Sequence, residues 1–186
     1  VFPLALFLIF CVIGFTFRTY SQPFLLLLLI PFSLTTVAWG HLFHGFPVNV
    51  ISLLGVIALV GILVNDGLVL ISKFNSNLRS GKSYDESLFG AGKERFRAIF
   101  LTSITTMAGL APIIFEKSFQ AQLLKPMAIS IAYGIGYATF LTLILLPILL
   151  SLTNTFKLNF IWLRSGLKLD KRDVEAPVIE LKRENK

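Results

Sequence analysis

The chain has 186 residues, of which 55% are hydrophobic and 15% are charged, and its formal net charge is +7. A soluble domain carries about a quarter charged residues, so the composition argues against a soluble protein. The alternative, a soluble all-α bundle, needs a polar face on each helix, whereas the segment 25–30 is apolar on all sides.

Long uncharged stretches predict helices that cross a membrane. Residues 1–17, 98–115 and 126–156 carry no charge, and Asp66 is the only charged residue within 19–72. A crossing needs roughly 20 apolar residues for about 30 Å of hydrocarbon, so 19–72 has room for two. We expect an all-α membrane protein whose residues 1–155 form a five-span transmembrane helical bundle. The expected spans are about 2–17, 23–43, 49–74, 97–115 and 126–152.

The distribution of basic residues predicts the orientation of these spans. Basic residues gather between the third and fourth spans and again after residue 156, whereas the 41–50 loop has none. Because positive loops stay in the cytoplasm, we expect the 75–95 loop and the C-terminus to be cytoplasmic. The 41–50 and 116–125 loops then face outward. A positive net charge can also indicate nucleic-acid binding. Here the basic residues flank membrane spans, and that position explains the charge better.

Two segments outside the spans have patterns of their own. Ser83 followed by Glu86 is typical of a capping box, and an apolar stripe follows it. We therefore expect a short amphipathic helix at about 83–94 on the inner membrane surface. Within the tail, 156–186, we expect an interfacial segment followed by disorder from Asp170 onward.

Asp66 is the strongest candidate for a functional residue. It lies a little past the middle of the third span, where an ionised carboxylate costs several kcal/mol and usually serves a function such as proton transfer. Asn65 is its neighbour, and it shares a helix face with the small residues Ala58 and Gly61. That face could serve a proton relay or simply close helix packing.

The fourth span carries a second polar stripe that includes Arg95 and Thr102. Arg95 is placed at the cytoplasmic end, where a cation could attract a carboxylate or gate its protonation. It could equally be an ordinary positive-inside anchor. The Thr102 hydroxyl, about two turns further along the helix, could bond its own i−4 carbonyl instead of serving a relay.

Other chemistry finds little support in the sequence. His41 and His44 lie three residues apart, but no third ligand is near, so interface histidines are favoured over a metal site. Cys11, the only cysteine, cannot form an internal disulfide. There is no Walker-type loop and no nucleophile–base pair, so we expect no enzyme and no cofactor. Ion movement would then drive any transport.

Several motifs follow one another in a familiar order. They are Phe-Arg-Thr-Tyr-Ser-Gln-Pro-Phe at 17–24, Gly-Ile-Leu-Val-Asn-Asp-Gly at 61–67, a long motif from Gly-Lys-Glu-Arg to Leu-Ala-Pro at 92–112, Lys-Pro-Met-Ala-Ile-Ser at 125–130 and Leu-Pro at 146–147. In this order and spacing, residues 1–155 resemble helices eight to twelve of a resistance–nodulation–division (RND) efflux permease. This resemblance implies half of a twelve-helix membrane domain.

The resemblance also implies roles for individual residues. RND pumps carry protons through charged and polar residues that join a carboxylate pair on helix four to helices ten and eleven. Asn65 and Asp66 fall at the helix-ten positions, and Arg95 and Thr102 at those of helix eleven. The best-known drug exporters have a lysine where this chain has Asn65, so the charge balance of the relay must differ.

The resemblance implies a larger assembly as well. We expect a chain truncated before Val1, which lacks the first transmembrane half and the large periplasmic domains. The whole protein would be a proton-driven secondary efflux transporter of the bacterial inner membrane, a homotrimer in the lipid bilayer with a periplasmic adaptor and an outer-membrane channel. Two alternatives stay open: a protein-export accessory subunit of the same superfamily, and a non-transporting membrane anchor or assembly subunit.

Overall fold

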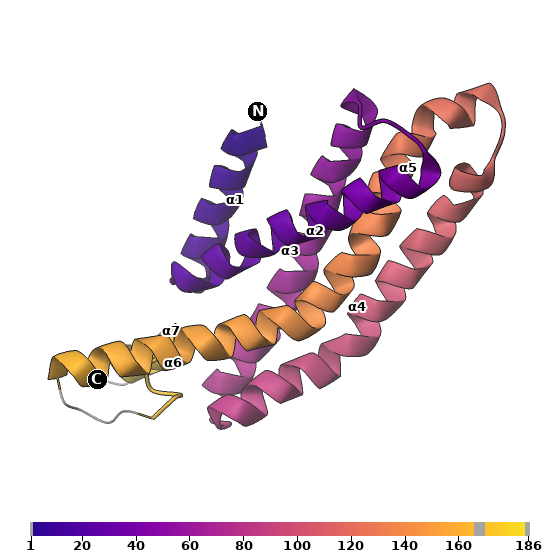
Figure 1. Ribbon diagram of the computed structural model, residues 1–186. Helices are drawn as coiled ribbons and strands as arrows, with labels where there is room; N and C mark the ends of the chain where they lie inside the picture. The colour runs from indigo at the N-terminus through magenta and orange to yellow at the C-terminus, as the bar shows by residue number, and fades with distance from the viewer. Residues whose placement is uncertain (1, 166–169, 185–186) are drawn as a thin grey trace.

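The computed structural model in Figure 1 describes residues 2–165 and 170–184. Within these ranges every regular element is a helix. In chain order they are α1 (Phe2–Phe17), α2 (Ser21–His44), α3 (Val50–Arg79), α4 (Tyr84–Phe115), α5 (Phe119–Phe140), the short π-helix η1 (Leu141–Leu145), α6 (Leu146–Ser165) and α7 (Ala176–Glu184). The predicted all-α architecture is confirmed.

Four helices of the described chain are long and apolar enough to cross a membrane. They are Ser21–His44, Val50–Arg79, Tyr84–Phe115 and the continuous stretch Phe119–Arg164. Figure 1 shows this last stretch, which contains α5, η1 and α6, as one long helix that bends along its length. The span expected at 2–17 is the helix α1, but its 16 residues cover only about 24 Å at 1.5 Å per residue.

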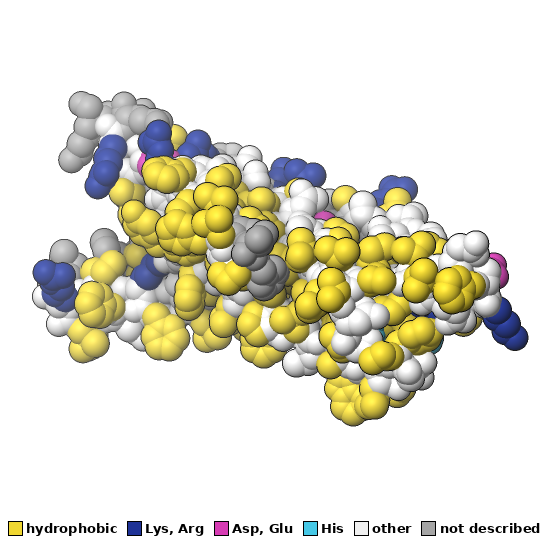
Figure 2. Space-filling view, turned by 90° about the horizontal axis from the view of Figure 1, so that it is seen from above, with side chains coloured by type: hydrophobic (Ala, Val, Ile, Leu, Met, Phe, Trp, Pro, Cys, Tyr) yellow, Lys and Arg dark blue, Asp and Glu magenta, His cyan; other side chains and the backbone are white. Residues whose placement is uncertain are grey.

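The outer surface of the bundle suits a lipid environment. Figure 2 shows hydrophobic side chains over most of the visible face, with Lys and Arg side chains toward its margins. Large aromatic residues such as Phe15, Trp39 and Phe115 are more than half exposed. In water such a surface would be unfavourable, whereas hydrocarbon tails solvate it as well as another helix does.

Helix α3 lies at the centre of the fold and packs most closely against α5. Gly55 on α3 makes this approach possible, since a Cβ there would lie 2.7 Å from the carbonyl oxygen of Met127 on α5. Gly134 on α5 also permits the approach, because the side chain of Leu59 on α3 occupies the space that a Cβ at Gly134 would fill. Small residues thus let the two backbones meet, as is common between membrane helices.

Histidines join the end of α2 to α5. The Nε2 atom of His41 is 2.9 Å from the Ser130 hydroxyl, and Nε2 of His44 is 3.0 Å from the Tyr133 hydroxyl. No group of three metal-ligating side chains occurs in the described residues. The pair therefore contributes helix-to-helix hydrogen bonds.

The segment predicted as a separate surface helix is the first part of α4. Its capping box is present, with the Ser83 hydroxyl accepting from the Glu86 backbone N–H and the Glu86 carboxylate accepting from that of Ser83. The helix then continues without a break to Phe115. The apolar stripe on this segment is buried inside the protein, where Tyr84 meets the Phe74 ring edge-on at 5.4 Å. The expected separate helix is thus part of α4, and its placement at the inner membrane surface stays a prediction.

The tail also differs from the expectation. Residues 170–184 were expected to be disordered, but they form turns followed by α7. Val174 and Val178 are buried, and the Asn154 amide donates to the Glu175 carboxylate at 2.7 Å. The charged composition of this segment suggested disorder. The two valines, four residues apart, are buried only by contacts within the folded bundle, and the local sequence does not reveal those contacts. The remaining part of the expected tail, at 166–169 and 185–186, lies outside the described residues.

We expect Gly55→Ala to destabilise the protein, because the new methyl group would meet backbone atoms of α5 that cannot move independently. Overpacking of this kind costs about 1–3 kcal/mol of unfolding free energy. Thermal unfolding of the detergent-purified protein measures the loss. Gly109→Ala is the matched control, since a Cβ at Gly109 has no atom within 4 Å. Equal stability of the two variants would contradict the packing argument.

Candidate functional site in the helix bundle

A groove of about 450 Å³ runs between α3 and α4 and reaches α5 at its base. Its walls carry an unusual number of polar groups for an apolar bundle. The lining residues are Ala58, Gly61, Ile62, Asn65 and Asp66 of α3, Thr102, Ser103 and Thr106 of α4, and Ile135 of α5. This groove brings together three of the four predicted site residues: Asn65, Asp66 and Thr102.

Asp66 faces the groove from α3 and is half-buried. Among the described residues, neither its carboxylate nor the amide of Asn65 has a hydrogen-bond or ion-pair partner. A carboxylate within a membrane span is costly unless it is paired, hydrated or protonated. The groove therefore presents a group able to bind a proton, a cation or a donor from another segment.

The small residues beside Asp66 keep the groove open. Sequence reasoning left two uses for the face that carries Ala58 and Gly61: close helix packing or a relay. A Cβ on Gly61 would meet no atom within 4 Å, and both residues are exposed. The closest approaches of other helices to α3 are made at Gly55 and Gly67 instead, so Ala58 and Gly61 border the open groove.

Thr102 stands on the opposite wall, on α4. Its hydroxyl lies 3.1 Å from the carbonyl oxygen of Ala98 and 2.9 Å from that of Ile99, so its proton is donated to its own helix. The oxygen lone pairs remain free to accept a hydrogen bond from the groove. The side chain is thus set to accept rather than to donate.

Arg95 does not line the groove. It precedes Thr102 by seven residues on α4, which is about two turns or 10 Å along the axis. Its side chain is half-buried, and its Nε atom has no hydrogen-bond partner among the described residues. The preceding residue, Glu94, pairs with Lys73 of α3 at 2.6 Å. Arg95 therefore lies with the charged groups beyond one end of the groove.

Sequence reasoning missed two hydroxyl residues of the site, Ser103 and Thr106. Ser103 is buried, donates to the Ile99 carbonyl at 2.8 Å and is 2.6 Å from the Thr139 hydroxyl of α5. This is a direct polar link between α4 and α5 beneath the groove. The spacing of Thr102 and Thr106, four residues apart on a helix, was a signal that could have located Thr106.

Known proteins resemble this sequence over most of its length. Residues 1–154 match the AcrB/AcrD/AcrF family. The chain belongs to this family of RND transporters. It is 30% identical over 154 residues to the cobalt-zinc-cadmium resistance protein CzcA of Cupriavidus metallidurans, an alignment that covers 83% of this chain and 14% of CzcA.

Two other relatives and a solved structure also match most of the chain. The swarming motility protein SwrC of Bacillus subtilis is 28% identical, with 82% of this chain and 15% of SwrC covered. The multidrug resistance protein MdtC of Serratia proteamaculans is 25% identical, with 87% of this chain and 16% of MdtC covered. The crystal structure of a heavy metal efflux pump superposes with a TM-score of 0.70 at 28% identity, covering 82% of this chain and 15% of that pump. The chain spans about a seventh of the length of these proteins.

We expect Ser103→Ala to weaken the contact between α4 and α5, because it removes the interhelical acceptor of the Thr139 hydroxyl and leaves only the Ile135 carbonyl of α5. One buried interhelical hydrogen bond contributes about 1 kcal/mol or less in a membrane protein. Unfolding of the detergent-solubilised protein by increasing SDS would measure the change. Thr105→Ala is the control, because that exposed hydroxyl bonds only to carbonyls of its own helix. An equal loss in both variants would show that the interhelical bond contributes nothing.

Proposed function

We propose that this chain is the C-terminal half-bundle of a proton-driven RND efflux transporter and that Asp66 carries the transported proton. The observation behind this proposal is the unpartnered Asp66 carboxylate in the groove between α3 and α4. Proton relays in transporters are built from carboxylates of this kind, placed within spans and facing an interior cavity. Membership of an efflux family supports the same function.

The other predicted site residues then assist Asp66. Thr102 offers an acceptor on the opposite wall, so it can orient a protonated Asp66 or a water molecule beside it. Asn65 is next to Asp66 on the exposed side of α3 and offers both a donor and an acceptor to a segment that covers the groove. Arg95, beyond the groove, gates the carboxylate through its positive charge.

The groove is open on one side, and we propose that the first transmembrane half of the complete gene product covers it. That half would supply the carboxylates that exchange protons with Asp66, and the large periplasmic domains would select the substrate. CzcA is named for resistance to cobalt, zinc and cadmium, and MdtC for multidrug resistance. We propose the same class of activity, the export of toxic compounds, for this protein.

We further propose a homotrimer in the bacterial inner membrane, with a periplasmic adaptor and an outer-membrane channel as partners and with a cytoplasmic C-terminus. Two features support the orientation. Basic residues gather at the end of α3, in the turn after it, in the first half of α4, and in the tail. In addition, Glu180 of the tail pairs with Arg18 and Arg79, so the α1–α2 turn, the end of α3 and the tail lie at the same end of the bundle.

Asp66→Asn in the complete gene product should reduce proton-coupled export to the background level while expression stays normal, because the amide cannot bind and release a proton. Substrate accumulation in everted membrane vesicles, driven by an imposed pH gradient, measures this. Asp85→Asn removes a carboxylate outside the groove, one paired with Lys171, and should leave transport intact. Undiminished export by Asp66→Asn would overturn the proposal.

Thr102→Val should slow export without abolishing it, because the change removes one hydrogen-bond acceptor and keeps the side-chain volume. A lost hydrogen bond of ordinary strength corresponds to about a threefold decrease in rate. The initial rate in the same vesicle assay reports this decrease. Thr105→Val, on the same helix but outside the groove, should retain the full rate. If both valine variants were fully active, Thr102 would have no part in the relay.

A further inference from the structure

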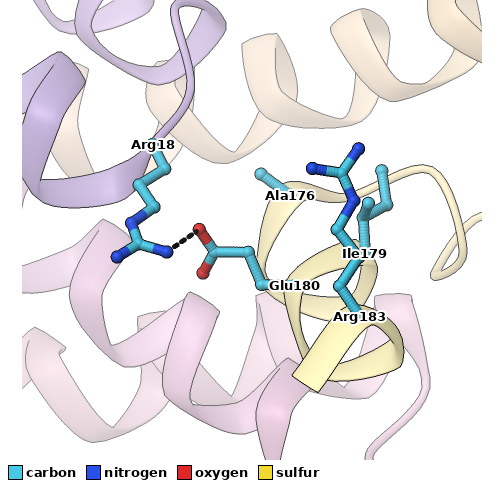
Figure 3. A pocket seen from close by; sticks show the side chains of 5 residues that line it. All are labelled: Arg18, Ala176, Ile179, Glu180 and Arg183. Atoms are coloured by element: carbon cyan, nitrogen blue, oxygen red, sulfur yellow. Dashed lines mark ion pairs between the residues drawn. The ribbon is translucent and has the colours of Figure 1, made fainter. Parts of the chain in front are cut away.

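A second cavity, of about 360 Å³, lies where the tail meets the turn between α1 and α2. Arg18 lines it from the turn, and Ala176, Ile179, Glu180 and Arg183 line it from α7. Figure 3 shows the Arg18 and Arg183 side chains on opposite sides of Glu180. Residues that are far apart in the sequence thus place two guanidinium groups around one opening.

The charges at this cavity are not balanced. Glu180 is 3.4 Å from Arg18 through one carboxylate oxygen and 2.9 Å from Arg79 through the other. Arg183 has no hydrogen bond or ion pair with any residue that the structure describes. The cavity is therefore lined by two guanidinium groups, those of Arg18 and Arg183, and by one carboxylate, that of Glu180, so this lining carries a net positive charge that favours an anion.

The position of the cavity limits which anion it meets. Arg18 lies in the turn that joins the apolar helix α1 to the membrane-spanning helix α2, so its height is that of the bilayer surface. Its side chain is 72% exposed and so free to reach a ligand. Ile179 and Ala176 give the cavity an apolar wall as well. A ligand with a charged group and an apolar part fits both walls.

We propose that this cavity binds a phosphate group, namely that of an anionic phospholipid headgroup held between Arg18 and Arg183. Guanidinium groups match phosphate oxygens through paired N–H donors and keep their charge at every physiological pH. Basic pockets at the membrane surface recognise lipid headgroups by the same chemistry. The bound lipid would fasten α7 to the bilayer at the place where Glu180 already joins it to Arg18.

Binding of phosphatidylglycerol to the detergent-purified complete gene product, measured by native mass spectrometry, tests the proposal. We expect tighter binding of phosphatidylglycerol than of zwitterionic phosphatidylcholine. Arg183→Ala should weaken phosphatidylglycerol binding about tenfold, the effect of losing charge-assisted hydrogen bonds. The Arg183 side chain is exposed and has no hydrogen bond or ion pair with the residues that the structure describes, so this variant should fold normally.

The control is Lys93→Ala, which removes one exposed positive charge outside the cavity. It should bind phosphatidylglycerol as the unmodified protein does. Equal binding by Arg183→Ala and the unmodified protein would overturn the proposal. Inorganic phosphate distinguishes the two sources of the phosphate group. Weak competition by it supports the lipid headgroup, whereas competition at the same concentration as the lipid assigns the site to free phosphate and overturns the lipid assignment.

Discussion

The close contact of α3 with α5 is the constraint on which the rest of the structure depends. Gly55 and Gly134 allow it, because any larger side chain at either position would push the two helices apart. In a membrane the hydrophobic effect does not hold helices together, so van der Waals contact at short distance has to do so. Once α3 is seated on α5, Asp66 lies in the groove that α3 forms with α4 and that α5 borders at its base.

The groove exists because only some of the small residues of α3 contact other helices. Gly55 and Gly67 are used for contact with other helices, while Ala58 and Gly61 border open space. The hydroxyls of α4 complete the polar walls, and the Ser103–Thr139 hydrogen bond ties that helix to α5. An apolar bundle can thereby present a carboxylate without pairing it internally. This arrangement suits a group that must exchange protons with a neighbouring segment.

The centre of the bundle is apolar, whereas ion pairs join the segments at the end near α7. Glu180 joins Arg18 and Arg79, and Glu175 is 3.6 Å from Lys157. Exposed ion pairs are individually weak, and the buried side chains of Val174 and Val178 add an apolar component to the docking of the tail. The tail therefore connects the α1–α2 turn, the end of α3 and α6.

The sequence by itself determined the membrane character, the long apolar helices and the placement of Asp66 within a span, because each depends on the local run of apolar residues. It also determined the capping box at Ser83, which needs only neighbouring residues. The tertiary structure decided which polar residues share a groove, and it separated Arg95 from Thr102 although both lie on α4. It also decided that the tail folds and that the first part of α4 is buried. Those outcomes depend on contacts between distant segments, such as Glu180 with Arg18, and no local pattern specifies which segments will meet.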